Sequence, residues 1–218
     1  MHFRNRTEAG QQLADLLGEY RYENTVVVAL NKGGVVVGEP IATQLHTPLY
    51  LMLSEPIELP GLHHELVGTL NQRGDFIYSN SLQAADVQGL ESEFRGSIEE
   101  QKIRKNHDMN QLLGEPGIVS ETVLREHVVI LVSDGLADQV PVQAALEYMK
   151  PLTIKKLVVT APMAAIDAID YLHVNCDQMH ILQPMGHIED LDRFYDEPDI
   201  PEDPEILATL KQIVLRWA

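Results

Sequence analysis

The sequence is poor in cysteine, in positive charge and in long apolar runs. A single cysteine, Cys176, stands among 218 residues, which excludes an internal disulfide and fits a reducing cytoplasm. Lysine and arginine together number 16, against 33 aspartate and glutamate residues, so the formal net charge is −17. A surface of that sign repels nucleic acid and anionic lipid. We therefore expect a cytoplasmic protein with no nucleic-acid or membrane partner.

The remaining bulk properties are those of an ordinary globular chain. Hydrophobic residues make up 44% and charged residues 22% of the sequence, and no stretch approaches a membrane-spanning length. The first residues lack the apolar core of a signal peptide. A chain of this length suits one α/β domain with a sizeable core, and we expect a single domain over 1–218.

Short apolar runs alternate with helical patterns along this domain. The apolar runs predict strands at 25–30, 48–53, 76–78, 127–132, 154–162 and 177–182. The helical patterns cover 8–17 (capped by Thr7), 35–45, 84–109, 142–149, 164–172 and 205–217. Such alternation predicts a doubly wound parallel sheet with helices on both faces.

The stretch 127–141 joins a buried strand, a small turn and the start of a helix. Its residues 128–132 are all apolar, as is typical of a parallel strand buried on both faces. The first N–H groups of a helix have no partner within the helix, so a strand, a tight turn and a helix start together form a natural anion site.

This turn resembles the substrate-binding signature of type I phosphoribosyltransferases. The resemblance implies that Asp134, with Ser133 in place of a first acid, holds ribose hydroxyls of phosphoribosyl pyrophosphate. It also implies that the following loop holds the 5-phosphate. That loop comprises Gly135, Leu136, Ala137, Asp138, Gln139, Val140 and Pro141.

The second half of the loop departs from the Thr-Gly-Thr-like pattern of the family. Asp138 would repel a phosphate group, the loss of a glycine removes easy access to positive φ, and Pro141 offers no N–H group. Asp138 is instead placed to cap the next helix, with Pro141 in its first turn. We predict that the chain fills its own anion site with this side chain.

A second loop resembles the family where it contacts pyrophosphate. Its residues are Asn31, Lys32, Gly33 and Gly34, where relatives tend to carry Pro-Arg-Gly-Gly. The arginine, which grips phosphate with two hydrogen bonds, is missing. Ser54 and Glu55 replace an Arg-Lys pair that the relatives carry after the next strand, so a third positive position is lost.

The resemblance assigns two further regions. Residues 54–115 would form a flap and hood around the acceptor base, with 56–70 interpreted as a loop. Residues 189–218 would form an acidic tail, with an aromatic-acidic segment at 194–196 and an amphipathic C-terminal helix that could serve a homodimer. The basic residues Lys102, Arg104 and Lys105 are interpreted as a helix face paired with Glu99 and Glu100.

Other kinds of site lack support in the sequence. His63 and His64 are adjacent rather than four residues apart on a helix, so we assign no metal site of protein side chains. Cys176 has no nucleophile signature and is interpreted as a packed thiol. No catalytic side chain is assigned, and Mg²⁺ is expected only where phosphoribosyl pyrophosphate is bound.

Three functions remain open from the sequence. By resemblance, the first is transfer of a 5-phosphoribosyl group from phosphoribosyl pyrophosphate to a nucleobase-like acceptor, with the activity impaired or lost. The second is a non-catalytic binding or regulatory module on the same fold, with a sugar phosphate or nucleotide as small-molecule partner. The third is an unrelated doubly wound domain that binds a nucleotide, although no Gly-x-Gly-x-x-Gly supports it.

Overall fold

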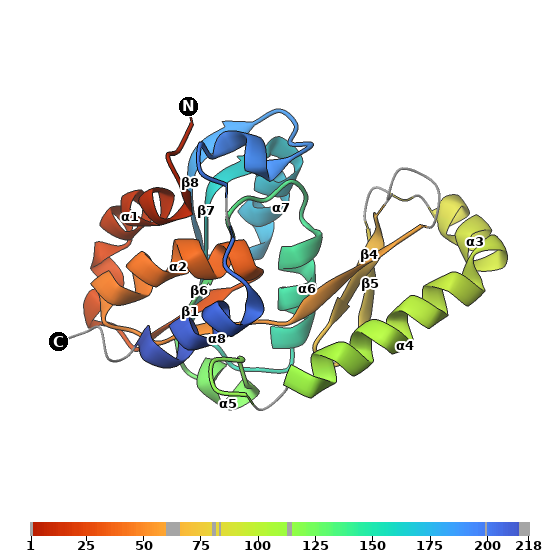
Figure 1. The fold of residues 1–218 in the computed structure, drawn as a ribbon, viewed down its shortest axis with the longest axis horizontal. Helices are drawn as coiled ribbons and strands as arrows, with labels where there is room; N and C mark the ends of the chain where they lie inside the picture. The colour runs from red at the N-terminus through yellow and green to blue at the C-terminus, as the bar shows by residue number, and fades with distance from the viewer. Residues whose placement is uncertain are drawn as a thin grey trace.

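A five-stranded parallel sheet forms the centre of the molecule (Figure 1). The computed structural model describes residues 2–59, 66–79, 82, 84–112, 115–198 and 200–213. All neighbouring strands of this sheet run parallel, in the order β2-β1-β6-β7-β8. The strands are β1 (Thr25–Ala29), β2 (Leu49–Leu51), β6 (Val128–Val132), β7 (Lys156–Ala165) and β8 (Gln178–Met185). The predicted parallel α/β sheet is confirmed.

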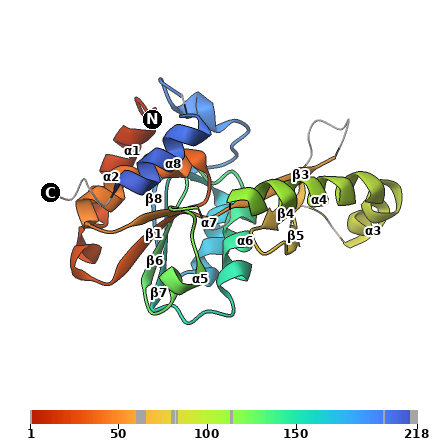
Figure 2. The ribbon, with the colours of Figure 1, turned by 60° about the horizontal axis from the view of Figure 1, so that its bottom comes forward.

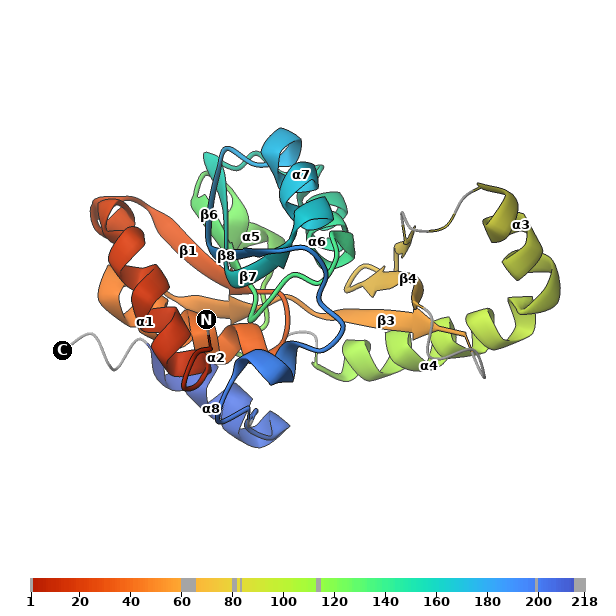
Figure 3. The ribbon, with the colours of Figure 1, turned by 90° about the horizontal axis from the view of Figure 1, so that it is seen from above.

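Helices cover both faces of this sheet (Figure 3). One face packs against α1 (Arg6–Leu16), α2 (Lys32–Leu45) and α8 (Asp203–Gln212). The other packs against α5 (Glu121–Leu124), α6 (Val140–Met149) and α7 (Ile166–Asn175). Along β6, Val128, Ile130 and Val132 belong to the first core, whereas Val129 and Leu131 belong to the second. This strand is apolar throughout because successive side chains enter different cores.

The strand order reverses between β1 and β6. From β1 the chain crosses through α2 to β2, and from β6 it crosses through α6 to β7 on the opposite side. The carboxyl ends of two adjacent strands therefore open into loops that diverge, which is where open α/β sheets bind ligands. We call these loops, 30–34 and 133–141, the switch point.

A second, antiparallel sheet projects from the central one (Figure 2). It contains β3 (Ser54–Glu58), β4 (Leu66–Asn71) and β5 (Phe76–Tyr78), with β4 in the middle. Helices α3 (Ala84–Glu93) and α4 (Arg95–Leu112) accompany it, and Ile57, Leu59, Val67 and Ile98 form its small core. We call this unit the hood.

The hood corrects two predictions. Residues 56–70 were expected to be a loop, yet β3 and β4 pair there, with Pro56 opposite Thr69. Pro56 is tolerated because β3 is an edge strand of its sheet. The single helix expected over 84–109 is two helices, α3 and α4, separated at Phe94.

The base of the hood is fixed to the central domain by a buried glutamine. The side-chain oxygen of Gln72 accepts a hydrogen bond from the Leu53 amide at 3.1 Å, and its nitrogen donates to the Val119 carbonyl at 3.0 Å. The Arg73 guanidinium lies 4.7 Å from the centre of the Tyr148 ring of α6. These contacts hold β3 and β4 beside the switch point.

Several predicted boundaries shift. Helix α1 is capped by Asn5, whose side chain accepts from the Glu8 amide at 3.0 Å, so Thr7 is not its cap. Helix α2 begins at Lys32 rather than at residue 35, and Pro40 lies inside it. Two short 3-10 helices were not predicted, η1 (Gly18–Tyr22) and η2 (Leu191–Phe194).

Among the described residues, none of the helices is both long and apolar enough to cross a bilayer.

Candidate functional site at the switch point

The loop after β1 is the capped first turn of α2. The side-chain oxygen of Asn31 accepts a hydrogen bond from the Gly34 amide at 2.5 Å. A Cβ atom on Gly33 would lie 2.0 Å from Oδ2 of Asp134, and one on Gly34 would lie 2.7 Å from the Val132 carbonyl oxygen. The two glycines are therefore required by close packing against the loop after β6 rather than by positive φ.

Asp134, the acid of the signature, lies at the centre of a buried network. Its Oδ2 accepts from Nε of Arg6 at 2.8 Å, and its Oδ1 accepts from Nδ2 of Asn31 at 2.8 Å. The side chains of Arg6 and Asp134 are only 2% and 4% exposed. Because both carboxylate oxygens accept hydrogen bonds and one partner carries a charge, the cost of burying this carboxylate is offset.

Arg6 also ties the C-terminal tail to this network. Its Nη2 donates to Asp192 at 2.6 Å, its Nη1 donates to the Pro198 carbonyl, and its guanidinium stacks on Tyr195 at 4.5 Å from the ring centre. Burial lowers the pKa of Arg6, but the hydrogen bonds and charges of Asp192 and Asp134 outweigh it and raise the pKa above its ordinary value. The guanidinium is therefore a permanent cation inside the site.

Tyr195 completes the enclosure of Asp134. Its hydroxyl donates to the backbone carbonyl of Asp134 at 2.5 Å. Burial, together with the charge of Asp134, raises the pKa of this hydroxyl, so it remains a neutral donor. From the sequence, 194–196 was noted as an aromatic-acidic segment, but no contact between it and the signature was predicted. Arg6 and Asp192 were also missed as members of the site.

Ser133 faces the interior of its own turn. Its hydroxyl donates to the Gly135 carbonyl at 2.7 Å, and the residue is only 2% exposed. The next residues extend the central sheet, since the Leu136 amide donates to the Met163 carbonyl at 3.0 Å. A Cβ atom on Gly135 would lie 2.2 Å from a methyl group of Leu191. Ser133 thus stabilises the turn and has no open side toward a ribose, while Ala137 is exposed.

The second half of this loop leads into α6. Asp138 accepts a hydrogen bond from the Val140 amide at 2.8 Å, which is the first amide of the helix. The cap position itself is occupied by Gln139, which makes no side-chain capping bond, and Pro141 lies in the first turn. Burial raises the pKa of Asp138, against a smaller opposite effect of the Val140 amide.

The basic residues near the site are paired with acids. Lys32, the cation of the first loop, forms an ion pair with Asp203 at the start of α8. Lys102 pairs with Glu99 at 3.0 Å, which is one of the two acids expected to pair with this basic face. Lys105 lies 3.6 Å from Glu55. None of these cations is left for a phosphate without breaking an ion pair.

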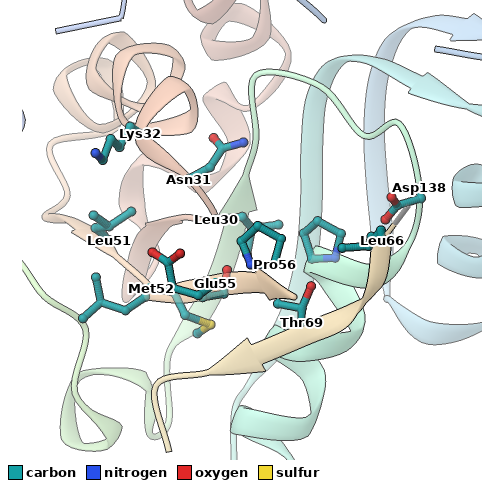
Figure 4. Close-up of a pocket in the computed structure, with 13 residues that line it drawn as sticks. Leu30, Asn31, Lys32, Leu51, Met52, Glu55, Pro56, Leu66, Thr69 and Asp138 are labelled. Atoms are coloured by element: carbon teal, nitrogen blue, oxygen red, sulfur yellow. The ribbon is translucent and has the colours of Figure 1, made fainter. Parts of the chain in front are cut away.

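A cavity of about 320 Å³ separates the switch point from the hood (Figure 4). Asp138 lies at one end and Lys32 at the other, with Glu55 and Thr69 between them. The remaining walls are mostly apolar. The full lining is Leu30, Asn31, Lys32, Leu51, Met52, Leu53, Ser54, Glu55, Pro56, Leu66, Thr69, Asp138 and Pro141.

The site offers little to a metal ion. No three of the described histidine, cysteine, aspartate and glutamate side chains lie together as metal ligands, and His63 and His64 are outside the described residues. Each oxygen of Asp134 already accepts one hydrogen bond, from Arg6 or from Asn31, and the Arg6 guanidinium balances its charge. Cys176 is half-buried and donates to the Leu172 carbonyl at 3.1 Å, and burial raises its pKa.

Comparisons with known proteins agree with this fold. No family model matches the sequence. Two proteins of Mycobacterium tuberculosis, from strains CDC 1551 and H37Rv, are each named "Putative phosphoribosyl transferase" and are 23% identical over 175 residues. The match covers 77% of this chain but 37% of each relative, so the chain spans well under half the length of those proteins.

A solved structure matches over nearly the whole chain. The crystal structure of TT1426 from Thermus thermophilus superposes with a TM-score of 0.70 at 23% identity, covering 97% of this chain and 99% of that one. At this identity the likeness establishes the fold alone. The chain is thus similar in sequence to two proteins that are named putative phosphoribosyl transferases, as the resemblance implied, and it shares its fold with TT1426.

Proposed function

We propose that this chain is a phosphoribosyltransferase-like protein whose affinity for phosphoribosyl pyrophosphate is impaired or lost. In this proposal it acts as a binding or regulatory module. One observation carries the proposal. Both carboxylate oxygens of Asp134, the signature acid, are bonded to side chains of the chain itself, Arg6 and Asn31. A ribose diol would have to compete with these two partners for the carboxylate.

The anion positions of the switch point support the same conclusion. The Gly34 amide at the start of α2 is taken by Asn31, and the Val140 amide at the start of α6 is taken by Asp138. Pro141 has no amide to offer. Each charge-assisted phosphate contact that is surrendered costs about 1.5 to 3 kcal/mol of binding free energy, so several losses together remove useful affinity.

The same reasoning applies to Mg²⁺. When bound with phosphoribosyl pyrophosphate, this ion would neutralise charge on the phosphates. Arg6 already balances the charge of Asp134, and no three of the described histidine, cysteine, aspartate and glutamate side chains lie together as metal ligands. The donor set of the described residues therefore does not fit a magnesium-loaded substrate.

An active transferase is the alternative. It is favoured by Asp134 and the two glycines at the switch point and by a hood beside the cavity. It requires a ribose diol to bind Asp134 in competition with Arg6 and Asn31. By resemblance, the reaction would then be transfer of a 5-phosphoribosyl group to a nucleobase-like acceptor held between the switch point and the hood.

Calorimetric titration with magnesium phosphoribosyl pyrophosphate separates the two. We expect no micromolar binding by the unaltered protein, because its anion positions are filled. The double variant Asp138→Thr with Gln139→Gly reopens the phosphate position, and binding that appears only in this variant would support the proposal. Micromolar binding by the unaltered protein would overturn it in favour of the transferase.

A further inference from the structure

Among the described residues, one charge that lines the cavity beside the switch point has no counter-ion. Three ionic side chains line it, Lys32, Glu55 and Asp138. Lys32 is paired with Asp203 and Glu55 lies 3.6 Å from Lys105, so these two charges are neutralised within the described part of the chain.

Asp138 is the exception. Its one hydrogen bond is with the Val140 amide at 2.8 Å, and no lysine, arginine or histidine among the described residues pairs with it. Its carboxylate is partly buried at the end of the cavity. A carboxylate in a poorly solvated place is costly to keep ionised unless a cation approaches it.

The rest of the cavity is lined mostly by apolar side chains, which suit the apolar part of a ligand. Leu30, Met52, Leu66 and Pro141 contribute hydrocarbon walls, and Thr69 contributes a single hydroxyl-bearing side chain. The volume, about 320 Å³, is at the small end of the range for small-molecule pockets. Such a space holds one compact molecule whose polar end meets the carboxylate and whose apolar end meets the walls.

We propose that this cavity binds a small organic cation with an aromatic or apolar frame, and that Asp138 is its counter-ion. The inference rests on the proposed function, because a cleft occupied by phosphoribosyl pyrophosphate would need charge of the opposite sign. It assigns Asp138 two tasks: its Oδ1 accepts from the start of α6, and its remaining lone pairs face the ligand.

Three probes of one shape test the sign of the charge. Benzamidine is a cation, benzamide is neutral and benzoate is an anion, while the ring and the size of the substituent are nearly the same. Titration followed by calorimetry or by amide chemical shifts should place benzamidine first, benzamide second and benzoate last. The Asp138→Asn variant keeps an acceptor for the Val140 amide and should reduce the benzamidine preference over benzamide by about tenfold.

Two further variants locate the effect. Asp170→Asn removes a carboxylate from the exposed face of α7 and should leave the preference unchanged. Leu66→Trp adds bulk to the cavity wall and should weaken all three probes alike while the charge preference persists. Because Leu66 is only half-buried at the start of β4, this variant also tests the cavity if Asp138→Asn does not fold.

The outcomes are distinct from those of the pyrophosphate titration. Benzoate binding as tight as that of benzamidine, or an unchanged preference in Asp138→Asn, overturns the inference; so does the absence of any benzamidine binding in the millimolar range. Each of these three results leaves the proposed function standing if magnesium phosphoribosyl pyrophosphate also fails to bind. Micromolar binding of that compound overturns the proposed function whatever the benzamidine series gives.

Discussion

The two loops of the switch point have the same local form but differ in how their charges are balanced. In each, a strand ends, a side-chain oxygen accepts from an amide near the start of the next helix, and the helix follows. Asn31 in the first loop is neutral, and its amide nitrogen also bonds to Asp134. Asp138 in the second loop is charged, and its partner within the described part of the chain is the Val140 amide at the helix start. The first loop is electrostatically complete, whereas the second leaves a carboxylate directed at a cavity.

The contrast extends to the two acids within the second loop, which differ in whether a cation reaches them. Asp134 lies beneath α1 and receives Arg6 from it, whereas Asp138 faces the gap between the central sheet and the hood. A side chain that accepts from a helix start does not by itself balance the charge of its loop. The charge is balanced where a third element supplies a cation, as α1 does with Arg6.

Removal of Arg6 is expected to lower the free energy of unfolding more than any other substitution considered for these loops. Arg6→Ala leaves Asp134 buried and without its counter-ion, and we expect a loss of about 3 to 5 kcal/mol in the free energy of unfolding. Urea denaturation measures it. The control is Arg193→Ala, whose side chain is 74% exposed and pairs with Asp190, with an expected loss within about 1 kcal/mol. Equal losses in the two variants would contradict the role given to the buried pair.

Removal of Asn31 tests the link between the loops. Asn31→Ala deletes the cap of α2 and one partner of a buried carboxylate, which together should cost about 2 to 3 kcal/mol. Asn5→Ala is the matched control, because Asn5 caps α1 through the Glu8 amide at 3.0 Å but does not contact Asp134. If both variants lose the same free energy of unfolding, the bond from Asn31 to Asp134 contributes nothing.

The glycines of the two loops differ in what an added methyl group would contact. Gly33→Ala places a methyl group against Asp134 and Arg6, which are held by several bonds, and should cost about 2 kcal/mol. Gly135→Ala meets a methyl group of Leu191, which can move aside, so its cost should be smaller. Gly89→Ala in α3 meets nothing within 4 Å and should stabilise by about 0.5 to 1 kcal/mol. Thermal denaturation measures the order of the three variants. A larger loss of stability in Gly135→Ala than in Gly33→Ala would contradict the claim that the contact at Gly33 is the less adaptable one.

The central sheet could be predicted from the sequence because each of its strands is recognisable from a local run of apolar residues. Residues 128–132 are apolar without interruption, and only a strand with a core on each side requires that pattern. The hood was predicted less well. Pro56, Glu55 and Gly68 suggest a loop by local preference, yet an edge strand accepts the proline and a close crossing at the Ile77 carbonyl requires the glycine.

The Arg6 network was missed because its partners are far apart in sequence. Arg6 and Asp134 are separated by 128 residues, and hydrophobic periodicity reports only the local face of a helix. A signal was nevertheless present. Arg6 lies three and seven residues before Ala9 and Leu13, both fully buried, so it belongs to the apolar stripe of α1. An arginine at that spacing indicates a buried acid elsewhere in the fold.

The smallest expected effect concerns the pH dependence of stability that Asp138 causes. Burial raises the pKa of Asp138 above its ordinary 3.8, so just above that pH the native state binds more protons than the unfolded state. The free energy of unfolding should therefore fall as the pH rises through the interval from 3.8 to the raised native pKa. Asp138→Asn should abolish this fall and be slightly more stable than the parent at neutral pH, whereas the exposed Asp170→Asn should follow the parent curve. A parent curve that rises across the same interval in direct comparison with Asp138→Asn would mean that Asp138 is stabilised by a cation after all, as Asp134 is by Arg6.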